Sequence, residues 1–126
     1  MPENLWPTEF GEIGLRTPVS ILREQALALG ERTANIVVGR VSPAGAPAGK
    51  FRHVLSLYCP PLAYQTTFLY VDHELGLYPA DIFIDGEENT PIRANDPEEF
   101  SRRLREIFSR DKTKKLIASL LAQSRA

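Results

Sequence analysis

The chain has 126 residues, of which 43% are hydrophobic and 25% are charged. This is the size and composition of one ordinary globular domain, which excludes a disordered chain or a collagen-like repeat. The single cysteine, Cys59, excludes an internal disulfide and therefore a small cysteine-stapled secreted fold. Residues 1–10 lack the basic start and apolar run of a secretory signal, and no stretch reaches the ~20 apolar residues of a membrane helix. We therefore expect a cytoplasmic protein that makes no membrane contact.

The formal net charge of −1 conceals an uneven distribution along the chain. Eight of the 15 basic residues but only four of the 16 acidic residues lie in residues 97–126, which gives this segment a charge of +4. Residues 1–96 carry a charge of −5. Such polarity bears on binding partners rather than on the fold.

Residues 1–16 are predicted to form an extended arm, because they contain two prolines and two glycines and show no hydrophobic period. The arm is nevertheless too apolar for a free tail. We expect it to pack against the body of the protein or against a second copy. Its apolar members are Leu5, Trp6, Phe10, Ile13 and Leu15.

A helix is predicted to begin at Thr17-Pro18. The threonine hydroxyl suits the N-cap position, and proline at the first helical position loses no hydrogen bond. Apolar residues then recur at helical spacing from Val19 to Leu29. Gly30 is predicted to end this helix in a left-handed conformation.

The middle of the chain is predicted to form four strands. Their apolar and β-branched residues are bounded by turn residues, as is typical of strands. The small residues and prolines of 42–49 predict a loop, and Pro60-Pro61 should end the second strand. The third strand has apolar residues on both faces, which places it near the middle of the sheet. The expected strands are 36–41, 50–59, 64–72 and 78–85.

Two helices are predicted after the strands. Asp96 is the expected N-cap of the first helix, with Pro97 at the first helical position and Glu99 bonding back to the Asp96 N–H. The apolar stripe of this helix would meet charged residues if the helix continued, so a break is expected at 109–111. The second helix should bury Leu116, Ile117, Leu120 and Leu121.

Strands bracketed by helices indicate an α+β fold. We expect a single domain over residues 1–126, in which a four-stranded, mainly antiparallel sheet and the helices form a two-layer sandwich. The connections between strands are short, which favours antiparallel pairing. The extended apolar arm covers residues 1–16, and the basic helical segment covers residues 97–126.

Two histidines and a nearby aspartate are the candidate metal ligands. If the second and third strands form a hairpin that folds about residue 62, His53 falls beside Val71 or Asp72, with His73 close by. Imidazole and carboxylate groups suit zinc, iron or manganese, so a metal-dependent hydrolase is one alternative. The spacing matches no known signature, and we favour one partly buried histidine, one solvated turn and no cofactor. Cys59 is expected to be a buried structural residue.

The basic helical segment suggests nucleic-acid binding as a second alternative, because clustered basic side chains can contact phosphates. The predicted turn between the two helices lacks glycine, and the second helix lacks polar residues that read bases. A solvated, partly ion-paired surface is the interpretation that we favour. The residues concerned are Arg102, Arg103, Arg105, Arg110, Lys112, Lys114 and Lys115.

Exposed aromatic residues predict a surface for binding protein. Tyrosine and tryptophan supply rigid, amphipathic contact area and are enriched at interfaces. No motif supports catalysis, so the sequence favours a non-catalytic protein-interaction module, with a protein partner or a second copy as its ligand. The candidate interaction residues are Trp6, Phe10, Tyr58, Tyr64, Tyr70 and Tyr78.

Overall fold

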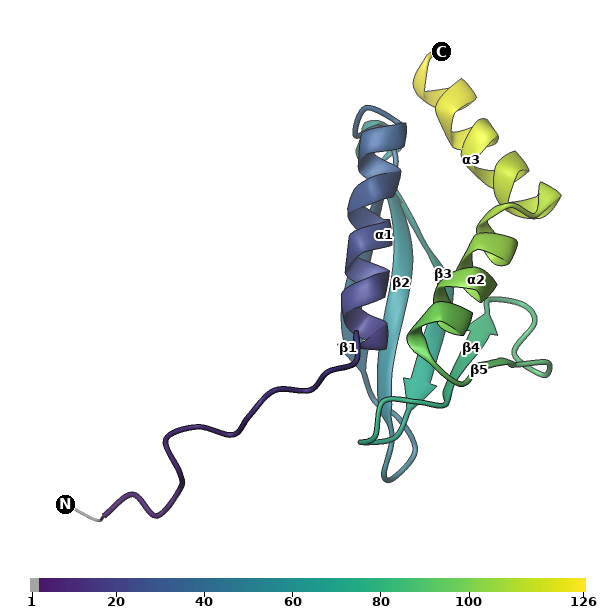
Figure 1. Ribbon diagram of the computed structural model, residues 1–126. Helices are drawn as coiled ribbons and strands as arrows, with labels where there is room; N and C mark the ends of the chain where they lie inside the picture. Colours follow the sequence, from purple (N-terminus) through teal and green to yellow (C-terminus); the bar gives the residue numbers. More distant parts are fainter. Residues whose placement is uncertain (1–2) are drawn as a thin grey trace.

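The computed structural model describes residues 3–126 and consists of three helices and a sheet (Figure 1). A short 3-10 helix, η1 (Pro60–Leu62), connects the second and third strands. The elements, in chain order, are α1 (Pro18–Arg32), β1 (Val38–Ala44), β2 (Phe51–Cys59), β3 (Tyr64–His73), β4 (Ala80–Ile84), β5 (Ile92–Ala94), α2 (Pro97–Phe108) and α3 (Asp111–Ser124).

The sheet has the order β1-β2-β3-β4-β5, and every neighbouring pair is antiparallel. The predicted α+β class, the antiparallel pairing and the central position of the third strand are confirmed. The number of strands is corrected from four to five. β5 was missed because it has only three residues, of which Ile92 and Ala94 pair with Ile82 and Ala80 on β4. Three residues are too few for an alternation to stand out.

β1 is displaced from its predicted bounds of 36–41. It continues through residues 42–44, which were expected to be loop, because Ser42, Pro43 and Ala44 pair with Val54, His53 and Arg52 on β2. A proline within a strand is tolerated here because β1 is an edge strand, with a neighbour on one side only.

The start of α1 is confirmed, since the Thr17 side chain accepts a hydrogen bond from the Ser20 amide. The prediction that Gly30 ends the helix is wrong. The helix continues to Arg32, and the left-handed residues that follow it are Ala34 and Asn35. Gly30 instead allows the Asn35 side chain to lie close to the helix backbone, because a Cβ atom at position 30 would lie 2.9 Å from the Asn35 Oδ1 atom.

The predicted N-cap of α2 is confirmed, because the Asp96 carboxylate accepts a hydrogen bond of 2.8 Å from the Glu99 amide. The reciprocal bond is corrected by one residue, since the Glu99 carboxylate accepts from the Asn95 amide rather than from the Asp96 amide. The break after Phe108 is also confirmed. The Thr113 hydroxyl spans it by donating to the Ile107 carbonyl at 2.8 Å.

All three helices pack on one face of the sheet, where they form a common core with alternate strand residues. Ile21 and Leu22 of α1 and Phe100 of α2 are almost fully buried in this core. Cys59 is buried, as expected. Of the four residues predicted to be buried in α3, only Leu120 is fully so. Among residues 3–126, no helix covers the opposite face of the sheet (Figure 1).

The arm extends away from the body of the protein (Figure 1). Every residue from 3 to 16 is exposed, so the first of the two expectations, that the apolar side chains of the arm pack against its own body, is wrong. Within residues 3–126, the structure contains no helix with the length and apolar character needed to span a membrane.

Candidate functional site

An apolar cleft lies between α1 and the α2–α3 pair, on the helical side of the sheet. Its volume is about 240 Å³, below the ~300–1,000 Å³ typical of small-molecule sites. We call it the interhelical cleft. Its walls come from all three helices and its floor from β2 and β3, and it is lined by Gln25, Ala26, Ala28, Leu29, Arg32, Leu55, Leu57, Phe68, Phe108, Thr113 and Ile117.

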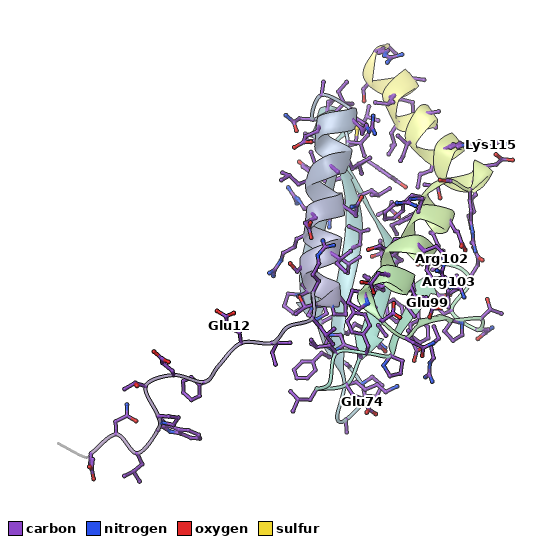
Figure 2. All side chains as sticks on the ribbon, in the orientation of Figure 1. Glu12, Glu74, Glu99, Arg102, Arg103 and Lys115 are labelled. Atoms are coloured by element: carbon purple, nitrogen blue, oxygen red, sulfur yellow. The ribbon has the colours of Figure 1, made fainter. Side chains whose placement is uncertain are left out.

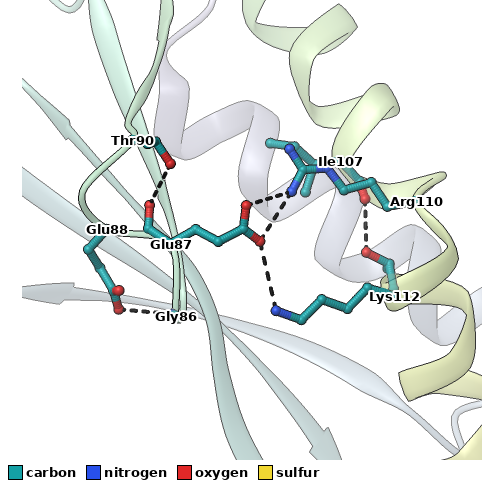
Figure 3. A network of polar contacts seen from close by, with 8 residues as sticks. Gly86, Glu87, Glu88, Thr90, Ile107, Arg110 and Lys112 are labelled. Atoms are coloured by element: carbon teal, nitrogen blue, oxygen red, sulfur yellow. Dashed lines mark hydrogen bonds and ion pairs between the residues drawn. The ribbon is translucent and has the colours of Figure 1, made fainter.

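Four of the seven basic residues predicted as candidate nucleic-acid contacts form ion pairs. Arg110 and Lys112 both contact the Glu87 carboxylate, at 3.1 and 3.8 Å (Figure 3). This network ties the β4–β5 connection to the junction of α2 and α3. On α2 itself, Arg102 pairs with Glu99 and Arg103 pairs with Glu106. Glu99, Arg102 and Arg103 are labelled in Figure 2.

The other three basic residues, Arg105, Lys114 and Lys115, are exposed and have no carboxylate within 4.0 Å in residues 3–126. The same holds for Arg32 on α1. Arg32 lines the interhelical cleft, and Arg105 lines an adjoining recess between α1 and α2. Lys114 precedes Ile117 of the cleft by three residues on α3, so the two share a helix face. Two basic side chains without an ion pair, those of Arg32 and Arg105, therefore lie at the cleft or in the recess beside it.

Two of the predicted interaction tyrosines share the helix-free face of the sheet. The Arg40 guanidinium lies 3.8 Å from the centroid of the Tyr58 ring, and the Arg52 guanidinium lies 4.2 Å from that of Tyr70. Tyr70 also stacks on Phe83 at 4.8 Å. These rings are thus engaged by their own neighbours in the sheet.

The remaining candidate interaction residues lie elsewhere. Tyr64 is exposed at the start of β3, and Trp6 and Phe10 are exposed on the arm. Tyr78 lies on the helical side, where its ring meets Phe100 edge-on and its hydroxyl donates to the Arg16 carbonyl at 2.7 Å. The structure therefore does not gather the six predicted residues into one surface.

A row of four charged residues crosses the helix-free face from β2 to β5. Arg52, Asp72, Asp81 and Arg93 are successive cross-strand partners. Arg52 donates two hydrogen bonds to Asp72, at 2.7 and 2.8 Å, and Arg93 donates two to Asp81, at 2.9 and 3.2 Å. The hydrogen bond to Asp72 raises the pKa of Arg52 above its ordinary value. We call these residues the charged row; its formal charge is zero.

His53 and His73 meet on the opposite, helical side of the sheet. Their Nε2 atoms are 3.2 Å apart, whereas their ring centroids are 5.3 Å apart. The two nitrogens are therefore closer than the ring centres, so each ring directs its Nε2 atom towards the other. The Nδ1 atom of His73 lies 2.7 Å from the Glu74 carbonyl, which can only accept. His73 therefore carries its proton on Nδ1, and His53 donates from Nε2 to Nε2 of His73.

This arrangement does not assemble the candidate metal site. Asp72 alternates with His73 along β3, so its carboxylate lies on the other face of the sheet and is occupied by Arg52. The alternation of a strand could have separated the two residues from sequence alone. Residues 3–126 contain no group of three or more histidine, cysteine, aspartate or glutamate side chains placed to hold a metal ion.

We expect the titration of His53 to make the stability of the protein depend on pH. Burial lowers the pKa of His53 below its ordinary value, with further lowering by His73 and by Arg23 of α1. The unfolded chain therefore binds a proton at this ring at a higher pH than the folded chain does. The contribution of His53 to the free energy of unfolding should be largest above the ordinary histidine pKa of about 6.5. It should fall as the pH decreases through that value.

Urea denaturation at about pH 8 and about pH 5.5 checks this expectation, since these conditions bracket the histidine titration. The His53→Gln variant retains a donor towards His73 but cannot titrate. Its free energy of unfolding should change less between the two pH values than that of the unmodified protein. An equal change in both proteins would contradict the assignment to His53.

Comparison with known proteins finds no family model, no curated protein and no solved structure that matches this chain. Its function is therefore inferred from the surfaces described above. Two of these surfaces, the interhelical cleft and the charged row, were missed in the sequence because each joins residues from elements that are distant in the chain.

Proposed function

We propose that this protein is a non-catalytic protein-interaction module whose N-terminal arm makes the principal contact with the partner, and that a homodimer is the simplest such complex. The observation that carries the proposal is the exposure of the arm. Its five large apolar side chains, from Leu5 to Leu15, are between 50% and 85% exposed. Concentrated apolar exposure of this kind marks an interaction site on a soluble protein.

The base of the arm is held by the body, which supports a defined contact. Arg16 forms an ion pair with Glu24 of α1, and its carbonyl accepts the Tyr78 hydroxyl. Burial raises the pKa of Tyr78 to about 12, so this hydroxyl stays protonated and remains a donor at physiological pH. The arm therefore leaves the body from a fixed point, which reduces the entropy lost when the arm binds.

Replacing Trp6 and Phe10 together with alanine is expected to weaken association by roughly thirtyfold or more, because loss of a large aromatic contact costs about 2 kcal/mol or more. Sedimentation velocity over a range of concentrations measures this change for self-association. A pull-down measures it for a different protein partner.

A matched control is available in the same chain. Leu27 and Leu75 are 69% and 81% exposed, so the Leu27→Ala/Leu75→Ala variant truncates two exposed apolar side chains outside the arm. This variant should associate like the unmodified protein. If the Trp6→Ala/Phe10→Ala variant also sedimented and captured partners like the unmodified protein, the arm would not be the contact and the proposal would fail.

A further inference from the structure

The interhelical cleft has the size and character to receive side chains from a peptide. Its floor is formed by Leu55, Leu57 and Phe68, and its volume is about 240 Å³. A cleft of this size accepts one or two large side chains rather than a cofactor-sized molecule, which needs ~300–1,000 Å³. Apolar grooves between helices bind peptides through a few such anchoring side chains.

The charges beside the cleft are opposite to those of the arm. Residues 3–15 contain Glu3, Glu9 and Glu12 and no basic residue, so this part of the arm carries a charge of −3. The cleft is flanked by Arg32 and Arg105, which have no carboxylate within 4.0 Å in the described part of the chain. Complementary charges of this kind guide association and fix the orientation of a bound segment.

The direction of the arm favours the cleft of another molecule. The arm joins α1 at its N-terminal end, whereas the α1 residues that line the cleft lie between Gln25 and Arg32, in the C-terminal half of this helix. To enter its own cleft, the arm would have to reverse at Arg16, where both the side chain and the carbonyl are held. In Figures 1 and 2 the arm, with Glu12 on it, instead runs outward from the body.

We infer that two copies of this chain exchange arms, and that the arm of each copy lies in the interhelical cleft of the other with Trp6 and Phe10 as the apolar anchors. The exchange is reciprocal, so it closes at two copies through the same pair of surfaces used twice. This inference rests on the proposed function and adds to it the binding site and the identity of the partner.

Disulfide trapping tests where the arm lies. Chains carrying Phe10→Cys are mixed with chains of different length carrying Leu29→Cys, which places a thiol in the cleft. Mild oxidation should give the mixed covalent dimer on a non-reducing gel. The matched control replaces Leu29→Cys with Leu27→Cys, which lies two residues away on α1 outside the interhelical cleft and is more exposed. Cys59 is fully buried and stays in every chain.

Preferential trapping at position 29 supports arm exchange. Equal or greater trapping at position 27 would overturn it, because random collision favours the more exposed thiol. A chain that carries both Phe10→Cys and Leu29→Cys and closes an internal disulfide as a monomer would also overturn it, by placing the arm in its own cleft.

A charge-swap experiment supplies a second measurement that leaves the cleft floor intact. The Arg32→Glu/Arg105→Glu variant should self-associate roughly tenfold more weakly, and addition of Glu9→Arg/Glu12→Arg should restore most of the loss. Lys50→Glu, in the β1–β2 loop, is the control for a reversed charge outside the cleft. If the Trp6→Ala/Phe10→Ala variant dissociates while the cleft variants do not, the arm binds elsewhere: the inference fails and the proposed function stands.

Discussion

Replacing Gly39 with alanine is expected to lower the free energy of unfolding by about 2–3 kcal/mol, a large loss for a single methyl group. A Cβ atom at Gly39 would lie 2.7 Å from both the Cα and the Cβ atoms of Ala26. The first is a backbone atom of α1 and the second is the methyl carbon of an alanine, so no flexible group can move aside. The helix would have to lift from β1, and α1 is also one wall of the interhelical cleft.

Gly45→Ala is the matched control for this substitution. A Cβ atom at Gly45 meets no heavy atom within 4 Å, and the backbone there is not left-handed. Alanine at such a position restricts mainly the unfolded chain, so this variant should be as stable as the unmodified protein or slightly more stable. Urea denaturation of the two variants measures the difference. Equal stability would show that α1 does not approach β1 as closely as the structure requires.

Arg52→Ala is expected to have the second large effect, a loss of about 2–3 kcal/mol. Asp72 is only 4% exposed, and both of its oxygens accept hydrogen bonds from Arg52. Without the guanidinium, a buried carboxylate remains with no partner. It also lies directly opposite Asp81 on the neighbouring strand, where like charges repel.

The other end of the charged row provides the comparison. Arg93 makes the same type of contact with Asp81, but the Arg93 side chain is 61% exposed. Water can solvate Asp81 after Arg93→Ala, so the loss in this variant should be much smaller. The Arg52→Ala/Asp72→Ala variant should recover part of the Arg52→Ala loss, because it leaves no unpaired charge. Equal losses for Arg52→Ala and Arg93→Ala would contradict the role assigned to burial.

The accuracy of the sequence predictions depends on how local each signal is. Thr17-Pro18 and Asp96-Pro97 identified the starts of α1 and α2, because an N-cap is defined by the residues within one turn. The break between α2 and α3 was also predictable, since Asp111 interrupts the apolar stripe. The predicted helix end at Gly30 was wrong, because glycine is needed at this position for the close contact with Asn35 and not for a left-handed backbone.

The candidate sites were predicted less well than the fold. His53 and His73 were expected to lie close together, and their Nε2 atoms are 3.2 Å apart. Asp72 was grouped with them by its position in the sequence, although the alternation of β3 puts it on the other face. The six aromatic candidates share only their residue type, which does not report which face of the sheet a residue occupies or what covers it.

The sequence by itself determined the starts of α1 and α2, the mainly antiparallel pairing of the strands and the apolar, acidic character of the arm. These properties follow from capping, short connections and residue type, all of which act over a few residues. Only the tertiary structure decided that β5 joins the sheet, that Glu87 forms ion pairs with both Arg110 and Lys112, and that Arg32 and Arg105 remain unpaired beside an apolar cleft. Each of these outcomes depends on side chains far apart in the chain, whose distances are set by packing of the whole core.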